Sequence, residues 1–188
     1  MNLILLFKED LISSENRVVI TGRRHKHILE FLKPAVGDEL CVGFINGKVG
    51  SGRVIKIDYR SVEMEISLIE NPPDPIPGTL VLAMPRPIVF NRILGHVTAI
   101  GIKKIILINS NRVEKSYWKS PVLKEDNIRA HLILGLEQAK DTVMPEISCH
   151  MKFNQFVENR LPGVLKGTSA FVAHPGAEEL IPCGTNTA

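Results

Sequence analysis

Cysteine is scarce in this chain, and its few cysteines are poorly placed to act together. The 188 residues include three, Cys41, Cys149 and Cys183, which are far apart and odd in number. A disulfide framework is indicated by an even number of cysteines in a short secreted chain, and a zinc site by paired Cys or His ligands at short spacing, neither of which occurs here. We therefore expect neither disulfides nor a metal site, and a reducing cytoplasm is the simplest setting.

Long hydrophobic runs are also missing. No apolar stretch approaches the roughly 20 residues that a membrane-spanning helix requires. The N-terminal segment MNLILLFKED is too short for a signal peptide and reaches charged residues at once. With 44% hydrophobic and 23% charged residues, the composition is typical of a soluble globular protein without a membrane partner.

Common catalytic and phosphate-binding motifs are absent as well. No GxxxxGK[ST] or GxGxxG precedes a predicted helix, so Gly43, Gly47, Gly50 and Gly52 are better explained as turn glycines. No Ser-His-Asp or Cys-His arrangement can be argued from the sequence. The function has to be inferred from the charge distribution and the fold.

Positive charge is concentrated in two regions, although the net charge is only +3. Between Arg86 and Arg129 nine Lys or Arg residues stand against three acidic ones. A second cluster, Arg23-Arg24-His25-Lys26-His27, lies in the first third of the chain. These two basic regions are stronger evidence for a polyanion partner such as RNA than the net charge is. The alternative for residues 23–27 is the solvated first turn of a helix.

Residues 1–70 are predicted to form a small β-barrel. Short apolar runs and the hairpin signal Asn46-Gly47 predict five or six strands, and residues 24–32 a short helix. His25 and His27 would point to different faces of that helix, so a shared metal is not expected. The run NPPDPIPG, residues 71–78, predicts a linker, and residues 79–188 then form a second domain.

The second domain is organised around residues 80–110. Residues 80–84 form an apolar run typical of a strand buried on both faces, and residues 89–99 have helical spacing that Gly101 ends. Residues 105–108 are apolar again. Strand, helix and strand predict a parallel sheet covered by helices on both faces, with functional residues in loops at the carboxyl ends of the strands. Loops 85–87 and 109–120 contain Arg86, Asn109, Asn111, Arg112, Lys115 and Lys119.

Several features after residue 110 have two interpretations. Tyr117 and Trp118, flanked by lysines, could stack on RNA bases, or Trp118 could pack on the domain surface or at a subunit contact. Glu137, in a helix predicted over residues 126–140, could be catalytic or could anchor a loop. Short elements are expected at 147 and 153–157. Residues 169–173 are predicted to form another buried strand, and His174 after it occupies a typical ligand-loop position.

Motifs throughout the chain resemble one known family. They are Gly22-Arg23-Arg24…His27-Ile28…Phe31-Leu32-Lys33…Val36-Gly37-Asp38, Met84-Pro85-Arg86-Pro87, Ile100-Gly101-Ile102, Asn109-Ser110-Asn111-Arg112-Val113-Glu114-Lys115-Ser116, Leu136-Glu137-Gln138-Ala139…Pro145-Glu146-Ile147 and Ala173-His174-Pro175-Gly176. Their order and spacing resemble the bacterial methyltransferases that modify N3 of a uridine in small-subunit (16S) ribosomal RNA, the RsmE family. These enzymes belong to the SPOUT superfamily.

The resemblance implies an α/β protein with an N-terminal PUA-like RNA-binding β-barrel and a C-terminal SPOUT-type domain with a trefoil knot. It also implies a homodimer that uses S-adenosylmethionine and no metal. The family's later cofactor loops, which form the knot, have no counterpart in the sequence up to Ala188. The second domain is therefore expected to be incomplete, with the knot region missing.

Site residues follow from the motifs together with the charges. Arg86 and Arg112 are the candidates for holding a phosphate or the uracil carbonyl oxygens, and so for the catalytic role. The candidates for RNA binding are Arg23, Arg24, Lys26, His27, Lys33, Lys115 and Trp118. The candidates for cofactor binding are His174, Pro175 and Gly176. The alternative is a non-catalytic RNA-binding protein with a degenerate or truncated second domain. A small-metabolite enzyme would leave the barrel and the basic regions unexplained.

Overall fold

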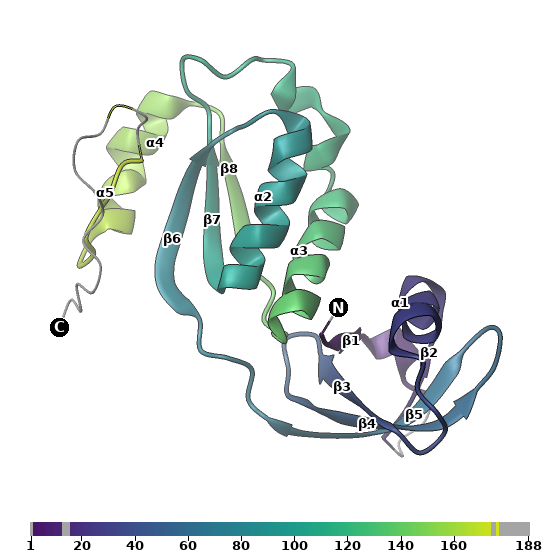
Figure 1. Ribbon diagram of the computed structural model, residues 1–188. Coiled ribbons are helices and arrows are strands. Elements are labelled where there is room, and N and C mark those ends of the chain that lie inside the picture. Colours follow the sequence, from purple (N-terminus) through teal and green to yellow (C-terminus); the bar gives the residue numbers. More distant parts are fainter. Residues whose placement is uncertain (1, 13–15, 174–175, 177–188) are drawn as a thin grey trace. The chain divides into compact units, whose positions relative to one another are not determined.

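The structure is a computed structural model that describes residues 2–12, 16–173 and 176 (Figure 1). The chain divides into two compact units, Met1–Met151 and Lys152–Ala188. Among the described residues, those of the first unit form two separate sheets, and those of the second include two short helices. In the described part of the chain, no helix combines the length and the apolar character that crossing a bilayer demands.

The first sheet has five strands in the order β1-β3-β4-β5-β2. Only the β1–β3 pair is parallel, and the other neighbours run antiparallel. The strands are β1 (Ile4–Leu6), β2 (Arg17–Ile20), β3 (Glu39–Phe44), β4 (Val49–Ile57) and β5 (Val62–Glu70). As predicted, Asn46 and Gly47 form the turn between β3 and β4, where the Gly47 N–H donates to the Phe44 carbonyl at 2.8 Å.

A short 3-10 turn, η1 (Lys8–Asp10), follows β1, and a longer helix packs on this sheet. It begins as α1 (Gly22–His27) and continues as a π-helical turn, η2 (Ile28–Leu32), which confirms the short helix predicted there. Ile28 is fully buried among Ile4, Val18, Val42 and Met64. This apolar cluster holds the helix on the sheet, and so fixes which side chains of α1 face outward.

The second sheet has three parallel strands, β6 (Ile76–Ala83), β7 (Ile102–Ile108) and β8 (Glu146–His150), in the order β6-β7-β8. The helices α2 (Pro87–Ile100) and α3 (Glu125–Ala139) make the crossovers and lie on one face of the sheet (Figure 1). Gly101 ends α2 with φ of 104°, as predicted. Phe90, Leu94 and Leu132 pack there with Ile105 and Leu107.

Two expectations about this region need correction. β6 begins at Ile76, within the proline-rich run expected to be a linker, because the Ile76 N–H donates to the carbonyl of Gly101 beyond α2. Residues 80–84 are also not uniformly buried, since Met84 is 2% exposed but Ala83 is exposed. β6 is an edge strand, and only its side toward α2 and α3 joins the described core.

The close approach of α2 and α3 depends on a glycine. A Cβ atom on Gly135 would lie 2.6 Å from both the Gly95 carbonyl oxygen and the Thr98 Cβ, whereas a Cβ on Gly95 would meet only the His131 carbonyl oxygen, at 3.8 Å. Gly135→Ala should therefore lower the free energy of unfolding by about 2 kcal/mol through overpacking. Gly95→Ala should raise it by about 0.5–1 kcal/mol, since alanine favours a helix interior. Urea unfolding of both variants measures the pair, and equal effects would contradict this packing.

The second unit contains α4 (Phe153–Asn159) and α5 (Leu161–Leu165). The helix expected at residues 153–157 is confirmed. The strand expected at residues 169–173 is wrong, because these residues have no regular structure and Phe171 and Val172 are 53% and 87% exposed. A short apolar run becomes a strand only when a neighbouring strand pairs with its backbone, and no described strand does so here.

Candidate functional site

The carboxyl ends of β6, β7 and β8 meet at one edge of the sheet. The Met84 N–H donates to the Ile108 carbonyl and the Asn109 N–H to the His150 carbonyl, both at 3.0 Å. These bonds place the start of loop 85–87 beside the start of loop 109–120, as the parallel-sheet argument predicted. His150 ends β8 at this edge and was not among the predicted site residues, although its place after an apolar strand could have indicated it.

Arg86 and Arg112 are both exposed at this edge. The Arg86 carbonyl accepts the N–H groups of Val89 and Phe90 in the first turn of α2, so its backbone is fixed. Neither guanidinium forms an ion pair with any residue that the structure describes. Two exposed arginines on anchored loops can bind phosphate or carbonyl oxygens without first breaking an ion pair with a described residue.

The contacts of Trp118 favour packing on the domain over stacking on an RNA base. Its indole N–H donates to Asn109 Oδ1 at 3.0 Å, and its ring packs with Tyr117 and Val113 against the core beneath α2 and α3. Short 3-10 turns, η3 (Tyr117–Lys119) and η4 (Pro121–Leu123), shape this part of the loop. Lys115 is exposed, so this loop can contact RNA through a positive charge rather than through a stacking aromatic ring.

Arg24, expected to bind RNA, is instead part of a buried cluster. Its Nη1 and Nη2 donate to the two carboxylate oxygens of Asp10 at 2.6 and 2.8 Å, and Nη1 also donates to the Leu5 carbonyl. Its guanidinium carbon lies 4.8 Å from the centre of the Phe7 ring. The side chain is 12% exposed and Asp10 is 5% exposed. This arginine holds the start of the chain against α1, and it is not available to a phosphate.

The other basic residues of α1 and η2 face different surroundings. His25 is buried, with Nε2 3.1 Å from the Asp58 carbonyl, whereas His27 stacks on Phe31 with ring centres 4.9 Å apart. The prediction that the two histidines point to different faces is therefore confirmed. Lys26 and Lys33 are exposed, and Lys26 lies 3.7 Å from Glu30, an exposed pair of little energetic weight.

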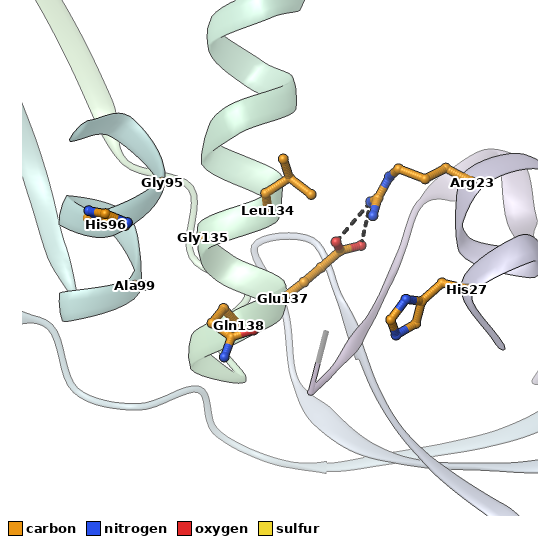
Figure 2. A pocket seen from close by; sticks show the side chains of 9 residues that line it. All are labelled: Arg23, His27, Gly95, His96, Ala99, Leu134, Gly135, Glu137 and Gln138. Atoms are coloured by element: carbon orange, nitrogen blue, oxygen red, sulfur yellow. Dashed lines mark hydrogen bonds and ion pairs between the residues drawn. The ribbon is translucent and has the colours of Figure 1, made fainter. Parts of the chain in front are cut away.

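Arg23 joins α1 to α3. Its Nη2 lies 2.7 and 2.8 Å from the two carboxylate oxygens of Glu137 (Figure 2). Glu137 is 1% exposed, whereas the side chain of Arg23 is 52% exposed. Of the two interpretations of Glu137, the structure favours the anchor, since its carboxylate is taken up by this pair.

Further hydrogen bonds strengthen the same junction. The N–H groups of Asn2 and Leu3 donate to the Glu137 carbonyl at 2.9 and 3.0 Å, and the Asn46 N–H donates to the Thr142 carbonyl at 2.8 Å. Sequence reasoning missed these bonds, because they join residues 96 to 135 positions apart and no local sequence pattern indicates them.

An open hollow lies beside the Arg23–Glu137 pair. Its volume is about 380 Å³. Leu134, Glu137 and Gln138 of α3 lie between α2 on one side and α1 on the other (Figure 2). The lining residues are Arg23, His27, Gly95, His96, Ala99, Leu134, Gly135, Glu137 and Gln138.

The described residues offer little for nucleophilic or metal chemistry. Partial burial raises the pKa of the Cys41 and Cys149 thiols, which disfavours the reactive thiolate. Within the described ranges, no three His, Cys, Asp or Glu side chains gather closely enough to hold a metal ion. His174 and Pro175, expected to bind the cofactor, lie outside the described residues, and Gly176 is exposed in the second unit.

Comparison with known proteins identifies the family. A family model described as an RNA methyltransferase domain matches residues 72–187, more than half of the chain. The chain therefore belongs to this family of RNA methyltransferases, and its α/β region is the part that carries the match.

Two curated relatives narrow the similarity to RsmE-like proteins. The chain is 32% identical over 149 residues to ribosomal RNA small subunit methyltransferase E of Treponema pallidum, and 29% identical over 147 residues to methyltransferase E 1 of Borreliella burgdorferi. These matches cover 79% and 78% of this chain but only 56% and 60% of the relatives. The chain thus spans less than two thirds of their length.

A solved structure supports the fold. The ribosomal RNA small subunit methyltransferase E of Neisseria gonorrhoeae, bound to S-adenosylmethionine, matches with a TM-score of 0.58 and 13% identity. The match covers 84% of this chain and 66% of that one. At this identity the likeness concerns the arrangement of the strands and helices alone.

Proposed function

We propose that this protein methylates N3 of a specific uridine in 16S ribosomal RNA. The observation that carries the proposal is the family match over residues 72–187, joined to two exposed arginines at the carboxyl edge of a parallel sheet. In open α/β sheets this edge is where ligands bind. The relatives are named for methylation of small-subunit ribosomal RNA, which is the substrate class that we assign to this chain.

We infer that S-adenosylmethionine supplies the methyl group, because the Neisseria gonorrhoeae methyltransferase E is bound to that molecule in its crystal structure. N3 lies on the Watson–Crick edge of uracil, so the target base must be unpaired or flipped out. The N3–H proton must leave as the nitrogen is methylated. Arg86 and Arg112 are proposed to hold phosphate or the uracil carbonyl oxygens, which aligns the ring and stabilises charge on the base when the proton departs.

The proposed assembly follows the resemblance. The five-stranded sheet would serve as a PUA-like RNA-binding domain, and the chain from β6 onward would belong to a SPOUT-type domain in a cytoplasmic homodimer. An RNA partner is supported by the curled sheet with its accompanying helix and by three exposed lysines: Lys26 on α1, Lys33 after η2, and Lys115. Arg24 is not among the proposed RNA contacts, because its side chain is paired with Asp10.

Methyl transfer in vitro tests this proposal. The purified protein is incubated with tritium-labelled S-adenosylmethionine and either small ribosomal subunits or free 16S RNA from cells that lack the modification. We expect label in 16S RNA, recovered as N3-methyluridine after digestion to nucleosides. Label in another nucleoside would overturn the N3 assignment. RNA binding without any transfer would favour the non-catalytic alternative.

A further inference from the structure

The hollow between α1 and the α2–α3 pair has the composition of a binding site for a planar ligand. Its floor is made of small and apolar groups, those of Gly95, Ala99, Leu134 and Gly135. Its volume of about 380 Å³ falls in the range of roughly 300–1,000 Å³ that small-ligand sites occupy. Gly95 and Gly135 carry no side chain, and Gly135 lets α2 and α3 approach closely at this point.

An exposed aromatic pair stands beside this hollow. His27 lines it, and the ring of Phe31 stacks on His27 with an angle of 21° between the ring planes. Phe31 is 71% exposed, so a large apolar ring faces water with only one face covered. Aromatic faces of this kind bind unpaired bases by stacking, and the loss of one stacked base weakens binding about fivefold or more.

Polar side chains line the same hollow, and exposed cations lie on the elements that contribute to it or directly after them. Gln138 and His96 line the hollow and can donate to or accept from the edge of a base. Lys26 on α1 and Lys33 directly after η2 are exposed cations close in sequence to His27 and Phe31. Arg92 is an exposed cation on α2, which lines the hollow. Stacking surface, hydrogen-bonding edges and nearby positive charge together suit a nucleotide of single-stranded RNA.

We propose that this hollow binds an unpaired nucleotide of the RNA substrate, at a site separate from the target uridine. The inference rests on the proposed function, because it takes RNA as the substrate. Glu137 lies 12 residues after the start of α3 at Glu125, roughly 18 Å along the helix axis. The site therefore anchors RNA well away from the carboxyl edge, where Arg86 and Arg112 lie, and sets the distance between an anchored nucleotide and the target.

The test compares two variants of the site with a matched control. Phe31→Ala removes the stacking face, and Ala99→Phe fills the hollow. Tyr59→Ala removes another exposed aromatic of the same domain, 79% exposed in the turn between β4 and β5 and stacked on Arg60 rather than beside the hollow. Fluorescence anisotropy measures the binding of a labelled single-stranded oligouridine to each full chain, after circular dichroism and thermal unfolding confirm that each variant folds.

We expect both site variants to weaken oligouridine binding by at least about fivefold, the lower end of one lost stacking interaction, and Tyr59→Ala to change it by less than about twofold. Duplex RNA should compete poorly. Wild-type affinity in both folded site variants, or no binding of oligouridine by the wild type, would overturn the proposal.

Methyl transfer separates this inference from the proposed function. If the protein methylates 16S RNA, the site variants should raise KM for RNA with little change in kcat, because the hollow lies away from the reacting atoms. If the wild type transfers no methyl group but shows the expected pattern of oligouridine binding, the proposed function fails and the nucleotide site stands. If transfer occurs and both folded site variants show wild-type KM and wild-type binding, only the nucleotide site is lost.

Discussion

Replacing Arg24 with alanine should lower the free energy of unfolding by about 3–5 kcal/mol, the loss typical when one partner of a buried ion pair is removed. The change leaves the Asp10 carboxylate, which is 5% exposed, without its two charged hydrogen bonds. It also removes the donor to the Leu5 carbonyl and the contact with Phe7. Chemical denaturation of the purified variant measures the loss.

Lys26→Ala on the same helix is the matched control. Lys26 is exposed and its only described ion pair, with Glu30, is exposed as well, so the free energy of unfolding should change by less than about 0.5 kcal/mol. If Arg24→Ala instead kept wild-type stability and lost RNA affinity, the prediction of an RNA-binding Arg24 would be right and its structural role wrong.

Arg112→Ala should lower the rate of methyl transfer by at least about tenfold while the fold stays intact, since charged hydrogen bonds to a substrate are worth about 1.5–3 kcal/mol. Arg86→Ala should act in the same direction, because loops 85–87 and 109–120 start side by side at the carboxyl edge. Single-turnover rates and thermal unfolding are measured together. Since both side chains are exposed, we expect little change in stability.

Arg60→Ala is the control for charge. Arg60 is an exposed arginine in the turn between β4 and β5 and stacks on Tyr59, so its loss removes the same charge without touching the carboxyl edge. It should leave the rate within about twofold of wild type. An equal fall in rate for Arg60 and Arg112 would indicate a general charge effect and would remove Arg112 from the site.

The sequence predicted the structure correctly where residues within one element determine that element's structure. The strand–helix–strand unit, the end of α2 at Gly101 and the turn at Asn46 and Gly47 follow from local periodicity and turn chemistry, and the structure confirms them. Loops 85–87 and 109–120 came together as predicted, because parallel strands end at one edge.

The sequence predicted a residue's environment poorly where its contact partner lies far away along the chain. Arg23 and Arg24 are neighbours with the same chemistry, yet Arg24 is buried with Asp10 and Arg23 pairs with Glu137, 114 positions away. The apolar residues 169–173 lack a described strand to pair with, so their composition misled the prediction. Trp118 could be assigned to packing only once Asn109 was seen to accept its N–H.

The measurement that tests the central claim most directly is the nucleoside content of 16S ribosomal RNA in cells of the source organism, before and after deletion of the gene. Mass spectrometry of the digested RNA should show N3-methyluridine in the parent, its loss in the deletion strain and its return when the gene is restored. N3-methyluridine at the parental level in the deletion strain would contradict the account.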